Sequence, residues 1–158
     1  MMKGLFYLIF TILPSFSLAQ QSQIPMAGEG TIWSLCDNPG THLLKARNVS
    51  IVPEQPRVGS DISVTINGDL SDDVSAGNVL LDLKLYVIKL RKELDLCQVL
   101  DSEIMSGASC PIKAGPVTLR AEAHIPEEVP KLPLKGDISI LDKGGRTLTC
   151  VHLDFQLQ

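Results

Sequence analysis

Short segments in which polar and apolar residues alternate, each ended by turn-forming residues, follow one another from Leu43 to the end of the chain. The clearest pair is Leu134–Leu141 and Thr147–Leu157, joined through Asp142-Lys143-Gly144-Gly145. Adjacent glycines supply the positive φ that a tight hairpin turn needs. A series of such segments is typical of an all-β sandwich or barrel, so we predict about seven strands and assign no helix.

Three more segments predict strands of the same kind. They are Leu43–Val52, which ends before Pro53, Asp61–Ile66, which is weakened at its end by Asn67-Gly68-Asp69, and Val117–Ile125. In each segment one face is apolar and the other polar, as expected for a sheet that buries one side.

The segment Val79–Leu90 is longer, and both of its faces are partly apolar. Asp82, Lys84 and Tyr86 mark the wetter face. A helix is the rival interpretation, since Leu and Lys also suit helices, but the strict alternation favours one long strand. The residues that would share its drier face are Val79, Leu81, Leu83, Leu85 and Val87.

The first residues have the pattern of a secretory signal peptide. Lys3 provides a positive start, Leu5–Leu13 a short apolar core, and Ser17-Leu18-Ala19 the small residues that a signal peptidase recognises. Because the core is too short to span a bilayer, we predict a signal peptide over residues 1–19 and entry into the secretory pathway. Residues 20–35 are then expected to form a loosely held lead-in and residues 36–158 a single domain.

Charge and composition exclude a nucleic-acid partner. The formal net charge is −4, and beyond the signal peptide the aromatic residues are Trp33, Tyr86 and Phe155. Such a chain lacks both the basic surface and the stacking platforms that nucleic acids need. Its interior must therefore be built almost entirely from Leu, Ile and Val. No strongly apolar outer face stands out, so we expect a monomer.

The four cysteines are Cys36, Cys97, Cys110 and Cys150. An even number in a secreted chain implies disulfides, and three pairings are possible. A zinc site is the competing interpretation, but the sequence has no CxxC motif and no closely spaced Cys/His pair.

The tripeptide Asn48-Val49-Ser50 matches the acceptor sequence for N-glycosylation. Because secretion would bring it to the modifying enzymes, we predict a glycan at Asn48. Such tripeptides also arise by chance, and an unused acceptor is the alternative.

No catalytic constellation is recognisable in the sequence. It has no G-x-S-x-G, H-E-x-x-H, P-loop or GxGxxG motif. The three histidines, His42, His124 and His152, lie in different segments without metal-ligand spacing, and the last two fall on polar faces. We therefore predict that the protein is not an enzyme and has no cofactor and no metal site.

The most distinctive motifs lie between Tyr86 and Leu119 and near the end of the chain. They are Lys89-Leu90-Arg91-Lys92, Leu94-Asp95-Leu96-Cys97, Cys110-Pro111-Ile112, Gly115–Leu119, Ile125–Pro130 and Thr149-Cys150. In these motifs the chain resembles the ML (MD-2-related lipid-recognition) domain, most closely the fungal phosphatidylglycerol/phosphatidylinositol transfer proteins. The resemblance implies an immunoglobulin-like two-sheet β-sandwich with a lipid cavity between the sheets. It also implies the disulfides Cys36–Cys150 and Cys97–Cys110.

The inward-facing side chains are then expected to line the cavity, with further residues at its mouth. The predicted wall residues are Ile62, Val64, Ile66, Leu81, Leu83, Leu85, Val117, Leu119, Val151, Leu153 and Phe155. At the mouth we expect Ile104, Met105 and Ile112, with Lys113, Arg91 and Lys92 as contacts for an anionic headgroup or membrane surface.

Two alternatives remain open for these residues. Alternation does not distinguish a hollow sandwich from a filled one, although the scarcity of aromatic residues and the apolar residues near solvent favour a hollow one. The basic residues are equally well explained as solvated charges. In place of the aromatic-rich strand of the family, Leu132–Ile140 has no aromatic residue, which leaves the choice of lipid open.

The function that the resemblance implies is binding of phospholipids such as phosphatidylglycerol and phosphatidylinositol and their transfer between membranes. Sterol transport in the endolysosomal or vacuolar lumen is the alternative within the family. A secreted lipid-sensing co-receptor and a filled structural sandwich are two further hypotheses. The expected partners are a phospholipid or sterol ligand and transient membrane surfaces, and the expected location is outside the cell or in the vacuolar or lysosomal lumen.

Overall fold

The computed structural model describes residues 32–36 and 38–158. The predicted signal peptide and most of the predicted lead-in lie outside the described residues. The strands in chain order are β1 Trp33–Leu35, β2 Leu44–Val52, β3 Asp61–Leu70, β4 Gly77–Leu85, β5 Ile88–Asp95, β6 Met105–Ser106, β7 Gly115–His124, β8 Pro133–Asp142 and β9 Thr147–Gln156. Two short helices join them, the 3-10 helix η1 Pro39–Thr41 and the α-helix α1 Leu96–Leu100.

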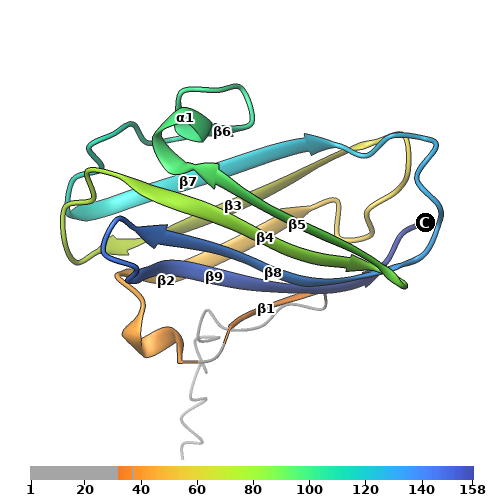
Figure 1. Ribbon diagram of the computed structural model, residues 1–158, viewed down its shortest axis with the longest axis horizontal. Helices are drawn as coiled ribbons and strands as arrows, with labels where there is room; N and C mark the ends of the chain where they lie inside the picture. Colours follow the sequence, from red (N-terminus) through yellow and green to blue (C-terminus); the bar gives the residue numbers. More distant parts are fainter. Residues whose placement is uncertain (1–31, 37) are drawn as a thin grey trace, which may run out of the picture.

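The strands form two antiparallel sheets that lie one over the other (Figure 1). One sheet has the order β1-β9-β8-β4-β5 and the other the order β2-β3-β7-β6. The prediction of an all-β two-sheet sandwich is therefore confirmed. Strands β2, β7, β8 and β9 begin and end within two residues of the predicted segments.

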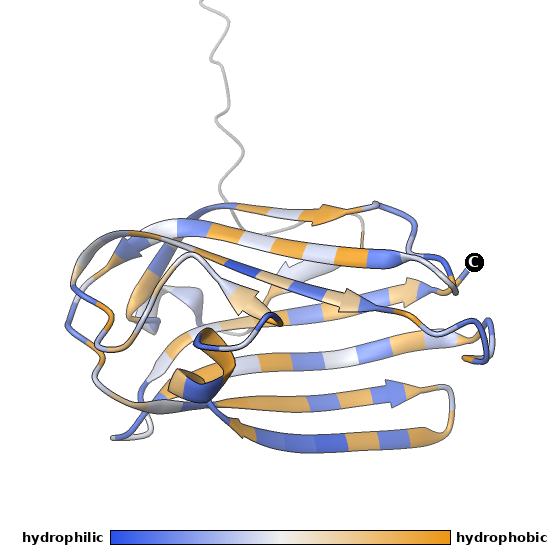
Figure 2. Cartoon of the chain, turned by 90° about the horizontal axis from the view of Figure 1, so that it is seen from above, coloured by the Kyte–Doolittle hydropathy of each residue, from blue (hydrophilic) through white to orange (hydrophobic). Residues whose placement is uncertain are grey.

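The alternation that predicted the strands also builds the core. Figure 2 shows hydrophobic and hydrophilic residues alternating along the strands, which gives each sheet one apolar face. The two apolar faces meet, and their buried side chains form one cluster that includes Leu44, Ile66, Leu119, Ile140 and Leu148.

The prediction that β3 weakens at Asn67-Gly68-Asp69 is wrong, because the strand continues through these residues. Gly68 lies beside a register shift in β2 between Ala46 and Asn48. A Cβ atom at position 68 would collide with the backbone carbonyl oxygen of Lys45. The glycine thus permits the close approach of two strands at a bulge instead of ending the strand.

The prediction of one long strand over Val79–Leu90 is also wrong, because the chain reverses at Tyr86-Val87. Leu85 at the end of β4 lies opposite Ile88 at the start of β5. Neither turn residue is a turn former, and apolar residues continue to alternate on both sides, so the sequence gives no sign of the reversal. Val87, which was expected to face inward, is 70% exposed at the tip of the hairpin.

The short helix α1 follows β5, although no helix was assigned from the sequence. Asp95 caps the helix, since its Oδ1 accepts a hydrogen bond of 2.9 Å from the Gln98 backbone N–H. Its residues Leu96, Val99 and Leu100 are buried. Five residues are too few to show helical periodicity, which is why the sequence did not predict it. No helix in the described part of the chain is long and apolar enough to cross a bilayer.

Both disulfides implied by the family resemblance are present. Cys36–Cys150 ties the start of the domain to β9 and spans 114 residues, while Cys97–Cys110 spans 13 residues and encloses α1 and β6. In the chain-entropy model bridges of these spans stabilise a fold by about 3 to 5 kcal/mol each. Residues 33–35, just before Cys36, form β1 and pair with β9. This part of the predicted lead-in is therefore a strand and not a loosely held segment.

Candidate functional site

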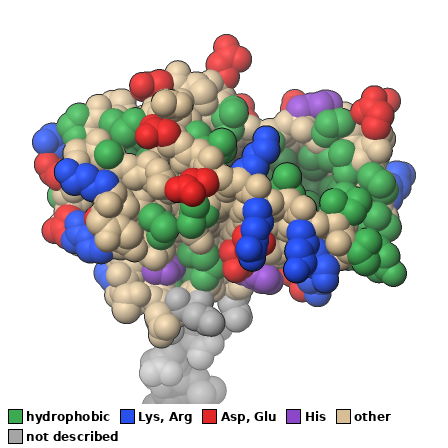
Figure 3. Space-filling model, in the orientation of Figure 1, with side chains coloured by type: hydrophobic (Ala, Val, Ile, Leu, Met, Phe, Trp, Pro, Cys, Tyr) green, Lys and Arg blue, Asp and Glu red, His purple; other side chains and the backbone are tan. Residues whose placement is uncertain are grey.

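An apolar cavity of about 600 Å³ lies between the two sheets. Small-molecule sites in proteins typically occupy roughly 300–1,000 Å³, so this volume is sufficient for a ligand. Its walls come from β4, β5, β8 and β9 on one sheet and from β3 and β7 on the other. The space-filling view in Figure 3 shows hydrophobic side chains gathered around a hollow on this side of the molecule.

The cavity opens between the edge strand β5 of one sheet and the end of β7 in the other, where the exposed cavity residues Ile88, Leu90 and His124 lie. β6 covers only part of the β7 edge, where it pairs with Arg120 and Ala121. The Glu122 backbone N–H still donates to the Ile104 carbonyl at 2.9 Å, but β6 does not continue along Ala123 and His124. The two sheets are therefore not bridged at this edge.

The cavity exists because β7 changes from large to small side chains along its length. Leu119 is buried toward the inner end, while Ala121 and Ala123 line the cavity nearer the mouth. They lie opposite Val64 and Ile62 of β3. Larger side chains at the two alanine positions would fill the space between the sheets.

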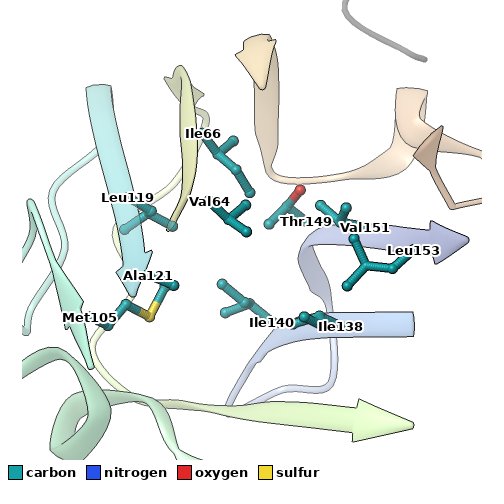
Figure 4. Close-up of a pocket in the computed structure, with 10 residues that line it drawn as sticks. All are labelled: Val64, Ile66, Met105, Leu119, Ala121, Ile138, Ile140, Thr149, Val151 and Leu153. Carbon is teal, nitrogen blue, oxygen red and sulfur yellow. The ribbon is translucent and has the colours of Figure 1, made fainter. Parts of the chain in front are cut away.

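A smaller chamber of about 70 Å³ adjoins the inner end of the cavity (Figure 4). It shares wall residues with the large cavity, among them Val64, Met105 and Ile140. Of the described residues that line it, Thr149 alone has a polar side chain. Among the described residues, the Thr149 hydroxyl is the one buried side-chain polar atom without a hydrogen-bond partner. Burial of an unpaired hydroxyl costs on the order of 1–3 kcal/mol.

Most of the expected wall residues line the large cavity. They are Ile62, Val64, Leu81, Leu83, Leu85, Leu153 and Phe155. Ile66, Leu119 and Val151 line the smaller chamber but not the large cavity. Val117 lines neither space and packs against the core.

The apolar residues expected at the mouth are separated in space. Ile104 lines the cavity and is 54% exposed, so it forms part of the rim. Met105 lines both spaces but is buried, which makes it a wall residue. Ile112 is buried and pairs with Val74 at the opposite end of the sandwich, so its placement at the mouth is wrong.

Lys113 also lies at that opposite end of the sandwich. Its Nζ is 2.9 Å from Asp73 Oδ2. A hydrogen bond from the Ala114 backbone N–H, together with the Lys113 ammonium, lowers the pKa of Asp73. Lys113 therefore belongs to a surface ion pair and is not placed to meet a headgroup at the mouth.

Arg91 and Lys92 point to opposite faces of β5, because neighbouring side chains in a strand alternate. Arg91 lies on the outer face, where its Nη2 is 2.7 Å from Asp82 Oδ2. The hydrogen bond to Asp82, with its charge, raises the pKa of Arg91. Lys92 lies opposite Leu81, on the face that also carries the cavity residue Leu90. Of the two, Lys92 is the side chain on the cavity side.

Several residues of the cavity were not predicted from the sequence. Those from the second half of the hairpin, from α1 and from the segment between β7 and β8 are Ile88, Leu90, Leu94, Val99, Ile125, Pro126 and Val129. If the turn at Tyr86-Val87 is taken into account, the alternation predicts that Ile88, Leu90 and Leu94 face inward. The rim also contains two polar side chains, Glu122 and His124, and the His124 Nδ1 is 2.7 Å from Asp61 Oδ1.

The cavity is suited to shielding an apolar molecule from water. Each methylene removed from water contributes about 0.8 kcal/mol. The two polar residues Glu122 and His124 line only its rim. In the residues that the structure describes, no three His, Cys, Asp or Glu side chains are grouped so as to hold a metal ion.

Comparison with known proteins identifies the family. The sequence profile of the ML domain matches residues 30–157, which is most of the chain. The protein belongs to the ML-domain family. This confirms the resemblance seen in the cysteine and Gly-Pro motifs of the sequence.

Relatives of this ML-domain protein cover most of its length. A phosphatidylglycerol/phosphatidylinositol transfer protein of Aspergillus fumigatus is 27% identical over 134 residues, covering 84% of this chain and 74% of the relative. A Dictyostelium discoideum protein provisionally given the same name is 31% identical over 133 residues, covering 82% of this chain and 85% of the relative. These names confirm that the family is one of transfer proteins and not of enzymes.

A solved structure shares the fold of this ML-domain protein. It is a Niemann-Pick type C2 protein from Japanese carpenter ant, with a TM-score of 0.63 and 18% identity, covering 80% of this chain and 99% of that chain. Both disulfides and this fold are consistent with a domain that matures in the secretory pathway. Asn48 lies exposed on the edge strand β2, where a glycan would meet solvent, and its glycosylation stays a prediction.

Proposed function

We propose that this ML-domain protein binds an anionic phospholipid, phosphatidylglycerol or phosphatidylinositol, and carries it between membranes. The observation that supports the proposal most directly is the apolar cavity of about 600 Å³ that opens at one edge of the sandwich. The names of the relatives indicate the same ligand class. Transfer would take place outside the cell or in the vacuolar or lysosomal lumen.

The energetic basis of carriage is the shielding of the acyl chains. A chain of about sixteen carbons exposed to water costs roughly 13 kcal/mol before other terms are counted. This cost makes spontaneous transfer between membranes slow. A protein that encloses the chains among Leu, Ile and Val side chains lowers it while leaving the polar headgroup outside.

The charges at the mouth favour an anionic headgroup on the β5 side. Lys92 is exposed on the cavity side of β5, and no described carboxylate forms an ion pair with it. On the other side of the mouth, Glu122 lines the rim and Glu127 and Glu128 are exposed nearby. A phosphate would therefore be attracted to the β5 rim and repelled by the opposite one.

The first test is native mass spectrometry of the protein secreted from a eukaryotic host, followed by organic extraction of its ligand. The delipidated protein is then loaded with a mixture of phosphatidylglycerol, phosphatidylinositol, phosphatidylcholine and sterol. We expect adducts with the anionic phospholipids. Exclusive sterol loading would replace the proposal by sterol transport, and failure to load any lipid would overturn it.

A pair of neighbouring substitutions tests the headgroup contact. Lys92→Gln removes a charge on the cavity side of β5, and Arg91→Gln removes the same charge on the outer face of the same strand. We expect Lys92→Gln to reduce loading of phosphatidylglycerol relative to phosphatidylcholine, with little change for Arg91→Gln. Equal effects of the two substitutions would show that the headgroup preference does not depend on the cavity side of β5.

A further inference from the structure

The tip of the β4–β5 hairpin does not have the composition of an ordinary turn. Two-residue hairpin loops favour Asn, Asp or Gly, because their backbones need positive φ. Here the loop is Tyr86-Val87, and Tyr86 has a φ of 54°. A bulky residue in this region of φ/ψ space is an outlier, and such outliers cluster at functional sites.

The tip also exposes its apolar side chains to solvent. Tyr86 is 61% exposed, Val87 70% and Ile88 59%. The Tyr86 backbone N–H donates to the Pro133 carbonyl at 2.9 Å, so the tip is attached to the neighbouring strand while its side chains project. A tyrosine beside aliphatic residues is the composition found where proteins meet the interface of a bilayer.

A row of lysines crosses the outer face of the sheet next to the tip. Lys84 lies directly opposite Lys89 on one side and Lys135 on the other. Like charges placed opposite each other destabilise a sheet. Only Lys135 has a carboxylate partner among the described residues, with its Nζ 2.8 Å from Asp154 Oδ2. The row therefore presents unneutralised positive charge beside the exposed apolar tip.

The tip is continuous with the mouth of the cavity. Leu85 and Ile88, which flank the turn, both line the cavity, as does Leu90 farther along β5. Figure 3 shows Lys and Arg side chains beside the hydrophobic side chains of this region. A surface that bound the tip would lie next to the opening through which a ligand enters.

We propose that the Tyr86-Val87 tip inserts into the interface of an anionic bilayer, while Lys84 and Lys89 contact its phosphate groups. The inference rests on the proposed function, because docking there places the cavity mouth at the membrane that supplies or receives the lipid. Basic residues near an anionic surface attract it, and apolar side chains add affinity when they leave water. The carboxylates of Glu127 and Glu128, across the mouth, orient the molecule with its hairpin toward the membrane.

The test is flotation of the secreted protein with phosphatidylcholine vesicles that contain or lack phosphatidylglycerol. The key variant combines Tyr86→Gly with Val87→Asn, which matches the positive φ of the first turn residue and so preserves the hairpin. We expect the wild type to bind only the phosphatidylglycerol vesicles, and the variant to lose at least tenfold in partitioning. Lys84→Gln and Lys89→Gln should each lose about fivefold. Lys143→Gln, at the opposite end of the sheet, is the matched charge control and should bind like the wild type.

Lipid loading in detergent separates this inference from the proposed function. Neither Tyr86 nor Val87 lines the cavity, so the turn variant should load phosphatidylglycerol like the wild type by native mass spectrometry. If the turn variant floats with anionic vesicles as well as the wild type does, the docking inference is overturned while the carrier function stands. If the wild type loads no lipid yet floats through its hairpin, the carrier function fails and the docking site stands. Equal wild-type binding to both kinds of vesicle would overturn the role of the lysines.

Discussion

The two ends of this sandwich are built from the same sheets but are filled differently. At the end that contains α1, Leu44, Val74 and Leu96 are each no more than 1% exposed. At the hairpin end, Ile88 and Leu90 are 59% and 46% exposed, although they line a cavity. The first end is a packed core, and the second is a container with an open edge.

The two disulfides show the same difference between the ends of the sandwich. The Cys97–Cys110 disulfide encloses the loop that covers the packed end, and Cys36–Cys150 fastens the half of β9 that leads away from the hairpin. No disulfide reaches the β4–β5 hairpin. The comparison teaches that stability is concentrated at one end of the fold, so that the other end can leave apolar surface unfilled.

Leucine truncation at the two ends tests this division with the largest expected effect. Leu96→Ala removes a fully buried side chain and should lower the free energy of unfolding by about 3 kcal/mol. Leu90→Ala removes a side chain that already faces solvent and should cost less than about 1 kcal/mol. Urea denaturation of the delipidated protein measures both. Equal losses would show that the hairpin end is as tightly packed as the α1 end.

Filling the cavity tests the open end directly. Ala121→Phe places a ring in the cavity and should reduce phospholipid loading at least tenfold, since the acyl chains and the ring compete for the same space. The control is Thr118→Phe, which adds the same ring on the outer face of the same strand and should load lipid normally. If Ala121→Phe loads lipid like the wild type, the ligand does not occupy this space.

The strands could be predicted because period-2 alternation needs only the neighbouring residues. For β2, β7, β8 and β9 that pattern coincided with clear breaks at glycine and proline. The β4–β5 hairpin was not predicted, because Tyr86-Val87 contains no turn-forming residue. The turn also decides which residues of β5 face inward, because its two residues change the alternation between the two faces. A single strand would turn Arg91 toward the cavity, whereas the hairpin turns Lys92 there.

The cavity itself could be predicted only in part from the sequence. Alternation identifies which side chains face inward, but not how far along the sandwich each one lies or what lies across from it. Leu119 and Ala121 both face inward on β7, yet one closes the inner chamber and the other leaves room for a ligand. The sequence predicts Ile112 at the mouth because it is near Cys110, whereas the bridge to Val74 places it in the packed end.

Thr149 lies where the two ends meet, and its replacement should have a smaller effect. Its buried hydroxyl has no partner among the described residues, so Thr149→Val removes an unsatisfied polar group at nearly constant shape. We expect the delipidated protein to gain about 1 kcal/mol in the free energy of unfolding. Thermal unfolding with and without bound phospholipid measures it. A loss of stability that appears only with ligand bound would assign the hydroxyl to the ligand.

The smallest expected effect concerns the pH dependence of the packed end. His42 is buried there, and burial, together with the charge of Lys45, lowers the pKa of its imidazole. The unfolded chain therefore binds a proton more readily than the folded one, so stability falls as the pH drops below about 6.5 and levels off below the folded pKa. His42→Gln should flatten this slope in chemical denaturation between neutral and mildly acidic pH. An unchanged slope would show that another group is responsible for the pH dependence. A flattened slope would show that acid weakens the end that carries most of the stability. The exposed hairpin end has no buried histidine among its described residues.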